Sequence, residues 1–200
     1  LRQRFLKICA QVPGLEAYFD ALRADMLKNP EAFLQREAAA GPGDHSQADD
    51  VLYRYAANLL VDNSALTGAP VVVEDHPTAV NLLGCVERES EMGALVTDFT
   101  LIRAGSLHRA NGGFLVLHVE DLLQHPTAWE GLLRALRANA ARIEDTGENP
   151  DTAIRTKGIV PDPVPLTLKV LLIGDDELYE TLLLNDERFP KLFRIKAHMA

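Results

Sequence analysis

Two uninterrupted apolar runs constrain the fold of this chain more than any other feature of its sequence. Residues 114–117 read Phe-Leu-Val-Leu and residues 170–173 read Val-Leu-Leu-Ile, and both runs have the length of a strand. Consecutive apolar residues cannot alternate between core and water, so we expect strands at 114–117 and 168–173 that are buried on both faces of a parallel sheet. Neither run approaches the roughly 18 apolar residues of a membrane span, so no membrane segment and no membrane partner is predicted.

Helical patterns alternate with these strands, which predicts an α/β fold built on a parallel sheet. Residues 1–38 have helical periodicity with a break at Pro13-Gly14, and residues 39–49 have the composition of a linker. The expected organisation is a helical arm at 1–38, a linker at 39–49 and an α/β domain at 50–200. In that domain we expect strands at 53–61, 70–73 and 193–195, helices from 78 and at 101–110, 127–138 and 178–184, and a hairpin that pairs 141–144 with 157–160. Thr127 and Glu130 predict a capping box for the helix at 127–138.

The charge balance limits the classes of partner. The formal net charge is −9, whereas phosphate contacts need clustered Lys and Arg, so nucleic acid is not an expected partner. Cys9 and Cys85 fit no metal or disulfide framework, and the sequence shows no signal peptide, which favours a cytoplasmic location. Because the chain starts at Leu1, we expect a fragment of a longer protein.

Ligands of open parallel sheets bind at the carboxyl ends of the strands, so the residues after each strand are the candidate site. The strand at 114–117 is followed by His118, Val119, Glu120 and Asp121. The strand at 168–173 is followed by a turn that begins Gly174-Asp175.

The order of several motifs resembles the AAA+ modules of Lon-related proteases. Residues 110–123 resemble the Walker B region; they read Ala-Asn-Gly-Gly-Phe-Leu-Val-Leu-His-Val-Glu-Asp-Leu-Leu. The hairpin expected at 141–160 resembles a presensor hairpin. Further similarity lies in residues 68–74 (Gly-Ala-Pro-Val-Val-Val-Glu), 77–84, 101–108 (Leu-Ile-Arg-Ala-Gly-Ser-Leu-His) and 129–136. The resemblance covers residues 50–197 and implies an AAA+-like large subdomain, with residues 1–38 as the end of a helical insertion.

The chain departs from the AAA+ pattern at the positions that handle nucleotide. No phosphate loop is present, and His118 and Val119 stand where the resemblance implies an Asp that helps to hold Mg²⁺ and a Glu that orients water. Neutral imidazole is a poor ligand for Mg²⁺. Glu120 and Asp121 are acidic, but they lie further past the end of the strand, so their side chains are expected to point in a different direction. Gly174-Asp175 stands at the sensor position, where the carboxylate of Asp175 would repel phosphate. We therefore expect no nucleotide site, no metal site and no cofactor.

The absence of these nucleotide-handling residues is similar to the pattern of the ATP-independent, LonC-type branch of these proteases. The resemblance then implies a degenerate domain that serves ring assembly, expected to be hexameric, and substrate gating for the degradation of unfolded proteins. Arg188 stands at the position where the resemblance implies an arginine that contacts the neighbouring subunit. The Ser nucleophile and Lys base of such a peptidase are absent from this chain, so it contains no predicted catalytic residue.

Two alternatives remain open. One is the active ATPase module of an ATP-dependent Lon-related protease, with ATP and Mg²⁺ as cofactors and its phosphate loop outside this fragment. The other is an AAA+ transcription regulator, against which the sequence Met-Gly-Ala-Leu-Val-Thr at 92–97 speaks, because it lacks the activator-loop signature.

Several polar and aromatic residues have an ordinary structural interpretation. We expect His118 to be a hydrogen-bonded structural histidine rather than a metal ligand with Glu120 and His125. Arg134 and Arg137 are expected to be solvated helix residues, and Trp129 to pack in the core or an interface. For Arg103, His108 and Arg109 the expected environment is a surface with ion pairs.

Overall fold

A computed structural model describes residues 14–30, 53, 55–91, 94–143 and 159–198 of the chain. Contacts between residues divide the chain into two units, Leu1–Ala57 and Asn58–Ala200. Within the described part, no helix combines the length and the apolar character that crossing a bilayer requires.

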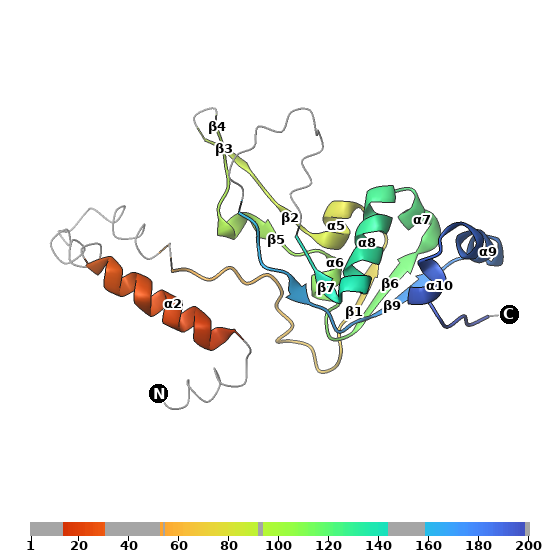
Figure 1. Ribbon diagram of the computed structural model, residues 1–200, viewed down its shortest axis with the longest axis horizontal. Coiled ribbons are helices and arrows are strands. Elements are labelled where there is room, and N and C mark those ends of the chain that lie inside the picture. The colour runs from red at the N-terminus through yellow and green to blue at the C-terminus, as the bar shows by residue number, and fades with distance from the viewer. Residues whose placement is uncertain (1–13, 31–52, 54, 92–93, 144–158, 199–200) are drawn as a thin grey trace. The chain divides into compact units, whose positions relative to one another are not determined.

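The first unit contains helix α2, Leu15–Lys28 (Figure 1). Gly14 precedes it with φ 84°, a conformation that glycine adopts without strain, so the predicted break at Pro13-Gly14 is the start of this helix. Asn29 ends it, with its backbone N–H bonded to the carbonyl of Asp25. The remainder of the predicted arm, 1–13 and 31–38, and the linker at 39–49 lie outside the described residues.

A three-stranded parallel sheet forms the centre of the second unit. Its strands are β1 (Val71–Glu74), β6 (Phe114–His118) and β9 (Lys169–Ile173), in the order β1-β6-β9. Val73 is in register with Val116, which is in register with Leu171. The predicted α/β class and the central position of the strand at 114–117 are confirmed.

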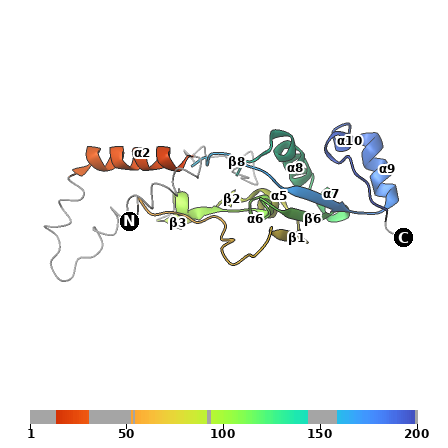
Figure 2. The ribbon, with the colours of Figure 1, turned by 90° about the horizontal axis from the view of Figure 1, so that it is seen from below.

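One face of the sheet packs into the core. Leu115 and Leu117 are fully buried and join a cluster to which six described helices contribute. These helices are α5 (Ala79–Leu83), α6 (Ser106–Arg109), α7 (Val119–Leu123), α8 (Pro126–Ala138), α9 (Asp176–Asn185) and α10 (Phe189–Leu192). Figure 2 shows α8, α9 and α10 on the same side of the strands.

The opposite face of the sheet is open in the described part of the chain. Five of its apolar side chains are 42 to 65% exposed, namely Val71, Val73, Phe114, Leu171 and Ile173, and Val116 on the central strand is half-buried. The prediction that the strands at 114–117 and 168–173 are buried on both faces is therefore wrong. Strand residues alternate between faces, and the described helices cover one face only.

Small antiparallel pairs flank the sheet. Strand β2 (Cys85–Val86) pairs with β5 (Ile102–Arg103), and β3 (Glu89–Glu91) pairs with β4 (Ala94–Val96). The prediction of a helix at 101–110 is wrong for its first half, because a 3-10 turn (Phe99–Leu101) and β5 lie there. Only α6, Ser106–Arg109, is helical.

The double glycine before β6 has two separate roles. Gly112 adopts φ 84°, in the left-handed region that favours glycine. A Cβ at Gly113 would overlap the carbonyl oxygen of Pro70, which accepts a hydrogen bond from the N–H of Phe114 at 2.8 Å. The second glycine therefore allows β1 and β6 to begin side by side.

Other local predictions need correction. Residues 55–63 form no strand; instead, the Asn58 amide donates to the carbonyls of Phe99 and Ile102 at 2.8 and 3.1 Å, and this fixes the segment without a ladder. Helix α8 begins at Pro126, whose fixed φ suits the first helical position, so the capping box at Thr127 is not formed.

Two strand predictions near the carboxyl end also change. In the hairpin, β7 (Ala140–Ala141) pairs with β8 (Val164–Pro165) rather than with 157–160; residues 144–158 lie outside the described part. Residues 193–195 form no strand, since no described strand lies beside them to complete a ladder.

Candidate functional site at the carboxyl end of the sheet

The three parallel strands end at the same edge of the sheet, as the sequence predicted. Strand β1 ends at Glu74, β6 at His118 and β9 at Ile173, and His118 is in register with Ile173. This edge is where a ligand of a parallel sheet is expected.

The junction between β6 and β9 at this edge is apolar. His118 is exposed, whereas Val119, the first residue of α7, is only 5% exposed. A Cβ built on Gly174 would lie 3.3 Å from the Cβ of Val119, so the backbone after β9 passes close to this valine and leaves little room for a side chain at position 174. A buried alkyl group and a glycine therefore lie beside each other at this edge.

The carboxylates near this junction lie at the N-termini of helices. Glu120 and Asp121 lie in the first turn of α7, where negative charge complements the helix dipole. Asp175 is the N-cap of α9, and its Oδ1 accepts the N–H of Leu178 at 2.7 Å. These local roles account for three of the acidic side chains that the sequence places after the strands.

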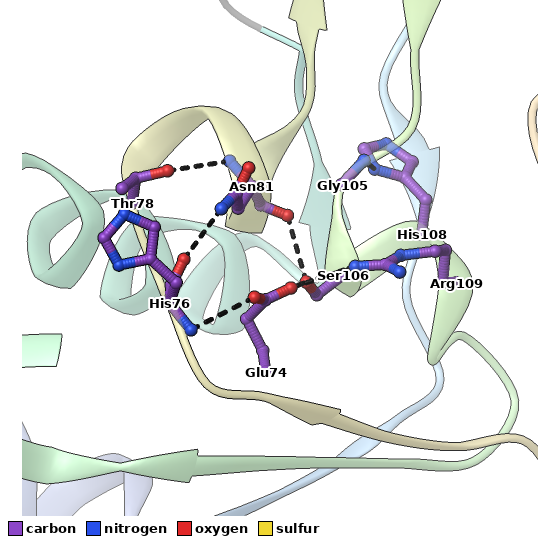
Figure 3. Close-up of polar contacts among 8 residues, drawn as sticks. All are labelled: Glu74, His76, Thr78, Asn81, Gly105, Ser106, His108 and Arg109. Carbon is purple, nitrogen blue, oxygen red and sulfur yellow. Dashed lines mark hydrogen bonds and ion pairs between the residues drawn. The ribbon is translucent and has the colours of Figure 1, made fainter. Parts of the chain in front are cut away.

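A polar network follows strand β1, as Figure 3 shows. The Glu74 carboxylate accepts a hydrogen bond from the Ser106 hydroxyl and pairs with the Arg109 guanidinium at 2.9 Å. The Ser106 Oγ also lies 3.0 Å from the carbonyl oxygen of Asn81 and from the Arg109 guanidinium. Ser106 is fully buried, so this network ties α5 and α6 to the end of β1.

The network has the residue types of a catalytic triad without the geometry of one. The Ser106 hydroxyl bonds the carboxylate directly, and the His108 ring turns to Gly105 instead, with Nδ1 accepting the Gly105 N–H at 3.3 Å (Figure 3). A base that does not contact the hydroxyl cannot take its proton. We therefore interpret the network as structural.

His108 is buried, which corrects the expectation of a surface residue. Its side chain is 5% exposed, and its Nε2 has no hydrogen-bond partner among the residues that the structure describes. Burial lowers the pKa of His108 from its ordinary value, because desolvation disfavours the imidazolium. Arg103 and Arg109 do form the expected surface ion pairs, with Glu87 and Glu74.

Burial of His108 predicts a pH dependence of stability. A depressed pKa in the folded state means that the unfolded chain binds more protons, so stability is complete above about pH 6.5 and falls as the pH drops below that value. The His108→Asn variant should lose this component. We expect the difference between the urea midpoints of the unchanged chain and of the His108→Asn variant to be smaller at about pH 5 than at about pH 7.5. A difference that is the same at both pH values would contradict the role of His108 in the pH dependence.

Arg188 is held by carboxylates of its own chain. It forms two hydrogen bonds with Glu130, at 2.6 and 2.7 Å, and contacts Asp186 at 2.8 Å. Hydrogen bonds from Arg188 lower the pKa of Asp186 to about 2, lower the pKa of Glu130 and raise the pKa of Arg188. The Trp129 indole donates to Asp186 at 3.2 Å and is 7% exposed, which confirms the predicted core packing of Trp129.

The histidines at this edge do not gather into a metal site among the described residues. His125 packs edge-on against His76, with ring centroids 5.4 Å apart, and no group of three metal-ligating side chains is found in the described ranges. The sequence prediction did not include Glu74 and Ser106. A usable signal was present, because Glu74 directly follows the apolar run at 71–73, as the other candidates follow their strands.

Comparison with known proteins agrees with the fold. Over 153 residues the chain is 28% identical to a protein of Escherichia coli (strain K12) described as "Putative Lon protease homolog". The match covers 76% of this chain and 24% of that protein, so the chain spans about a quarter of its relative. The family model "LonB-like, AAA domain" matches residues 67–200, two thirds of the chain. The chain therefore belongs to the family of LonB-like AAA domains.

Proposed function

We propose that this chain is a degenerate AAA+-like domain of a Lon-like serine protease, of the ATP-independent type, and that it serves ring assembly and substrate gating for the degradation of unfolded proteins. The supporting observation is the burial of Val119 beside Gly174 at the end of β6 and β9. An alkyl side chain is buried at a position where nucleotide chemistry would require a carboxylate, so we assign the domain a role through its surfaces.

The residues at this edge do not fit ATP with Mg²⁺. Mg²⁺ requires oxygen ligands, whereas His118 offers an imidazole nitrogen and Val119 an alkyl group. The carboxylate of Asp175 is engaged by the start of α9. We therefore assign no step of the reaction to nucleotide. We assign the peptidase chemistry to residues outside this chain.

Calorimetry of the chain with ATP and Mg²⁺ tests the degenerate character of the domain. We expect no measurable heat of binding, because the chain lacks a phosphate loop and both acidic positions are changed. A dissociation constant below about 100 μM, or a bound nucleotide after purification, would instead favour the ATPase alternative.

The assembly role makes a separate prediction for Arg188. Each subunit of a closed ring presents two different faces, and Arg188 is the candidate side chain for one of them. If it reaches a neighbour's carboxylate, Arg188→Ala in the whole protease shifts the ring to smaller species in sedimentation velocity and lowers peptidase activity. Glu130→Gln, which removes one of the two carboxylates that hold Arg188 within its own chain and leaves the contact with Asp186, should preserve or strengthen assembly.

Two results decide whether Arg188 acts between subunits. Equal loss of assembly in Arg188→Ala and Glu130→Gln would mean that the pair only braces its own subunit. An unchanged distribution for Arg188→Ala at low micromolar concentration would remove Arg188 from the interface. Arg23→Ala on α2 is the matched control, because it removes an exposed arginine from the other unit.

A further inference from the structure

A groove between α8 and α10 concentrates positive charge. Its volume is about 690 Å³, in the range of binding pockets for ligands larger than a single ion. Five cationic side chains line it: Arg134, Arg137, Arg188, Lys191 and Arg194. The chain as a whole carries a net charge of −9, so this surface differs in sign from the molecule around it.

One carboxylate, Glu130, accompanies these cations among the lining residues, and Arg188 contacts both of its oxygens. The cations Arg137, Lys191 and Arg194, at the end of α8 and around α10, contribute most to the positive potential of the groove. Arg137, Lys191 and Arg194 are exposed. A positive concavity raises the local concentration of anionic ligands, and arginine binds carboxylates through two parallel hydrogen bonds.

The groove also has an apolar component. Leu133, Leu136 and Leu192 contribute to its lining; Leu133 is almost fully buried and the other two are half-buried. A site that reads only phosphates needs no such component, whereas a peptide can place apolar side chains on the leucines and carboxylates on the cations. Burial of apolar area in this way adds to the affinity for a peptide.

We propose that this groove binds an acidic, amphipathic segment of another polypeptide, in which carboxylates alternate with apolar residues. The carboxylates pair with Arg137, Lys191 and Arg194, and the apolar side chains rest on Leu136 and Leu192. This site is distinct from the edge of the sheet, and its test does not depend on ring assembly.

Fluorescence anisotropy of the full 200-residue chain tests the site with labelled peptides. The probe alternates Glu with Leu; a second peptide replaces each Leu by Ser, and a third replaces each Glu by Lys. The Glu-Leu peptide should bind best, more weakly as salt is raised because the charges are screened, and the Lys-Leu peptide should not bind. A single-stranded oligonucleotide of equal charge is the polyanion control.

Charge reversal locates the site. Arg137→Glu with Lys191→Glu should weaken the Glu-Leu peptide about tenfold or more, and the milder Arg137→Gln with Lys191→Gln serves if the first variant does not fold. Arg23→Glu with Lys28→Glu on α2 makes the same change of charge elsewhere and should leave binding unchanged. Leu192→Ser should weaken the Glu-Leu peptide and leave the Glu-Ser peptide unaffected.

Three outcomes would overturn the proposal. One is the absence of binding up to about 1 mM, which is an affinity of about 4 kcal/mol. Another is equal loss in the groove and α2 variants, which would mean that binding follows net charge. The last is equal or tighter binding of the oligonucleotide or of the Glu-Ser peptide, which would mean a general polyanion surface without a role for the leucines.

Discussion

Leu117→Ala should lower the free energy of unfolding of this chain by about 2–5 kcal/mol, the usual cost of a cavity in a core that cannot collapse. Leu117 is fully buried on the central strand, and its neighbour in register on β9 is Leu172, which also packs against the core. Urea unfolding at neutral pH measures the change.

Leu171→Ala provides the matched control on the same sheet. Leu171 points to the opposite face and is 45% exposed, so its truncation should cost less than about 1 kcal/mol. Equal costs for the two leucines would mean that the open face is covered in solution. A cost under about 1 kcal/mol for Leu117 would contradict its central position.

Val119→Glu should destabilise the chain by about 3 kcal/mol, because it places a carboxylate where the side chain is 5% exposed and packs on Gly174. The pKa of this glutamate should lie above its ordinary value, so the destabilisation should be smaller at about pH 5 than at neutral pH. Urea unfolding at the two pH values measures both effects.

His118→Asp, at the first of the two acidic positions, is the control for Val119→Glu. His118 is exposed, so the substitution should change the free energy of unfolding by no more than about 0.5 kcal/mol. The combined His118→Asp, Val119→Glu variant restores the residue types that nucleotide chemistry requires, and we expect it still to show no heat with ATP and Mg²⁺. A stable Val119→Glu variant would contradict the packed junction on which the proposed function rests.

The amphipathic character of α8 connects the core with the surface that we propose as a binding site. Its inner face buries Trp129, Leu132 and Leu133 in the hydrophobic core. Its outer face carries Arg134 and Arg137, which the sequence analysis took as ordinary solvated residues. They are solvated as expected, and α10 brings Lys191 and Arg194 into the same groove.

The sequence by itself determined the local features of this protein that depend on residue type and spacing. Apolar runs identified β6 and β9, the helix pattern identified α8 and α9, and the position after each strand identified His118, Val119, Gly174 and Asp175 as the edge of the sheet. Runs of apolar residues signal burial because any exposed arrangement costs hydrophobic free energy.

Only the tertiary structure decided how these elements meet. An apolar run does not say which face a neighbour covers, so Phe114 and Leu171 read as core although they are exposed. Arg188, Glu130 and Asp186 form one network from helix α8 and the turn between α9 and α10, and Ser106 reaches Glu74 across 32 residues. Such contacts depend on the packing of distant segments, for which the spacing along the chain carries no signal. The burial of Val119 against Gly174 has the same origin, since a residue after a strand can face water or core until the next strand is placed beside it.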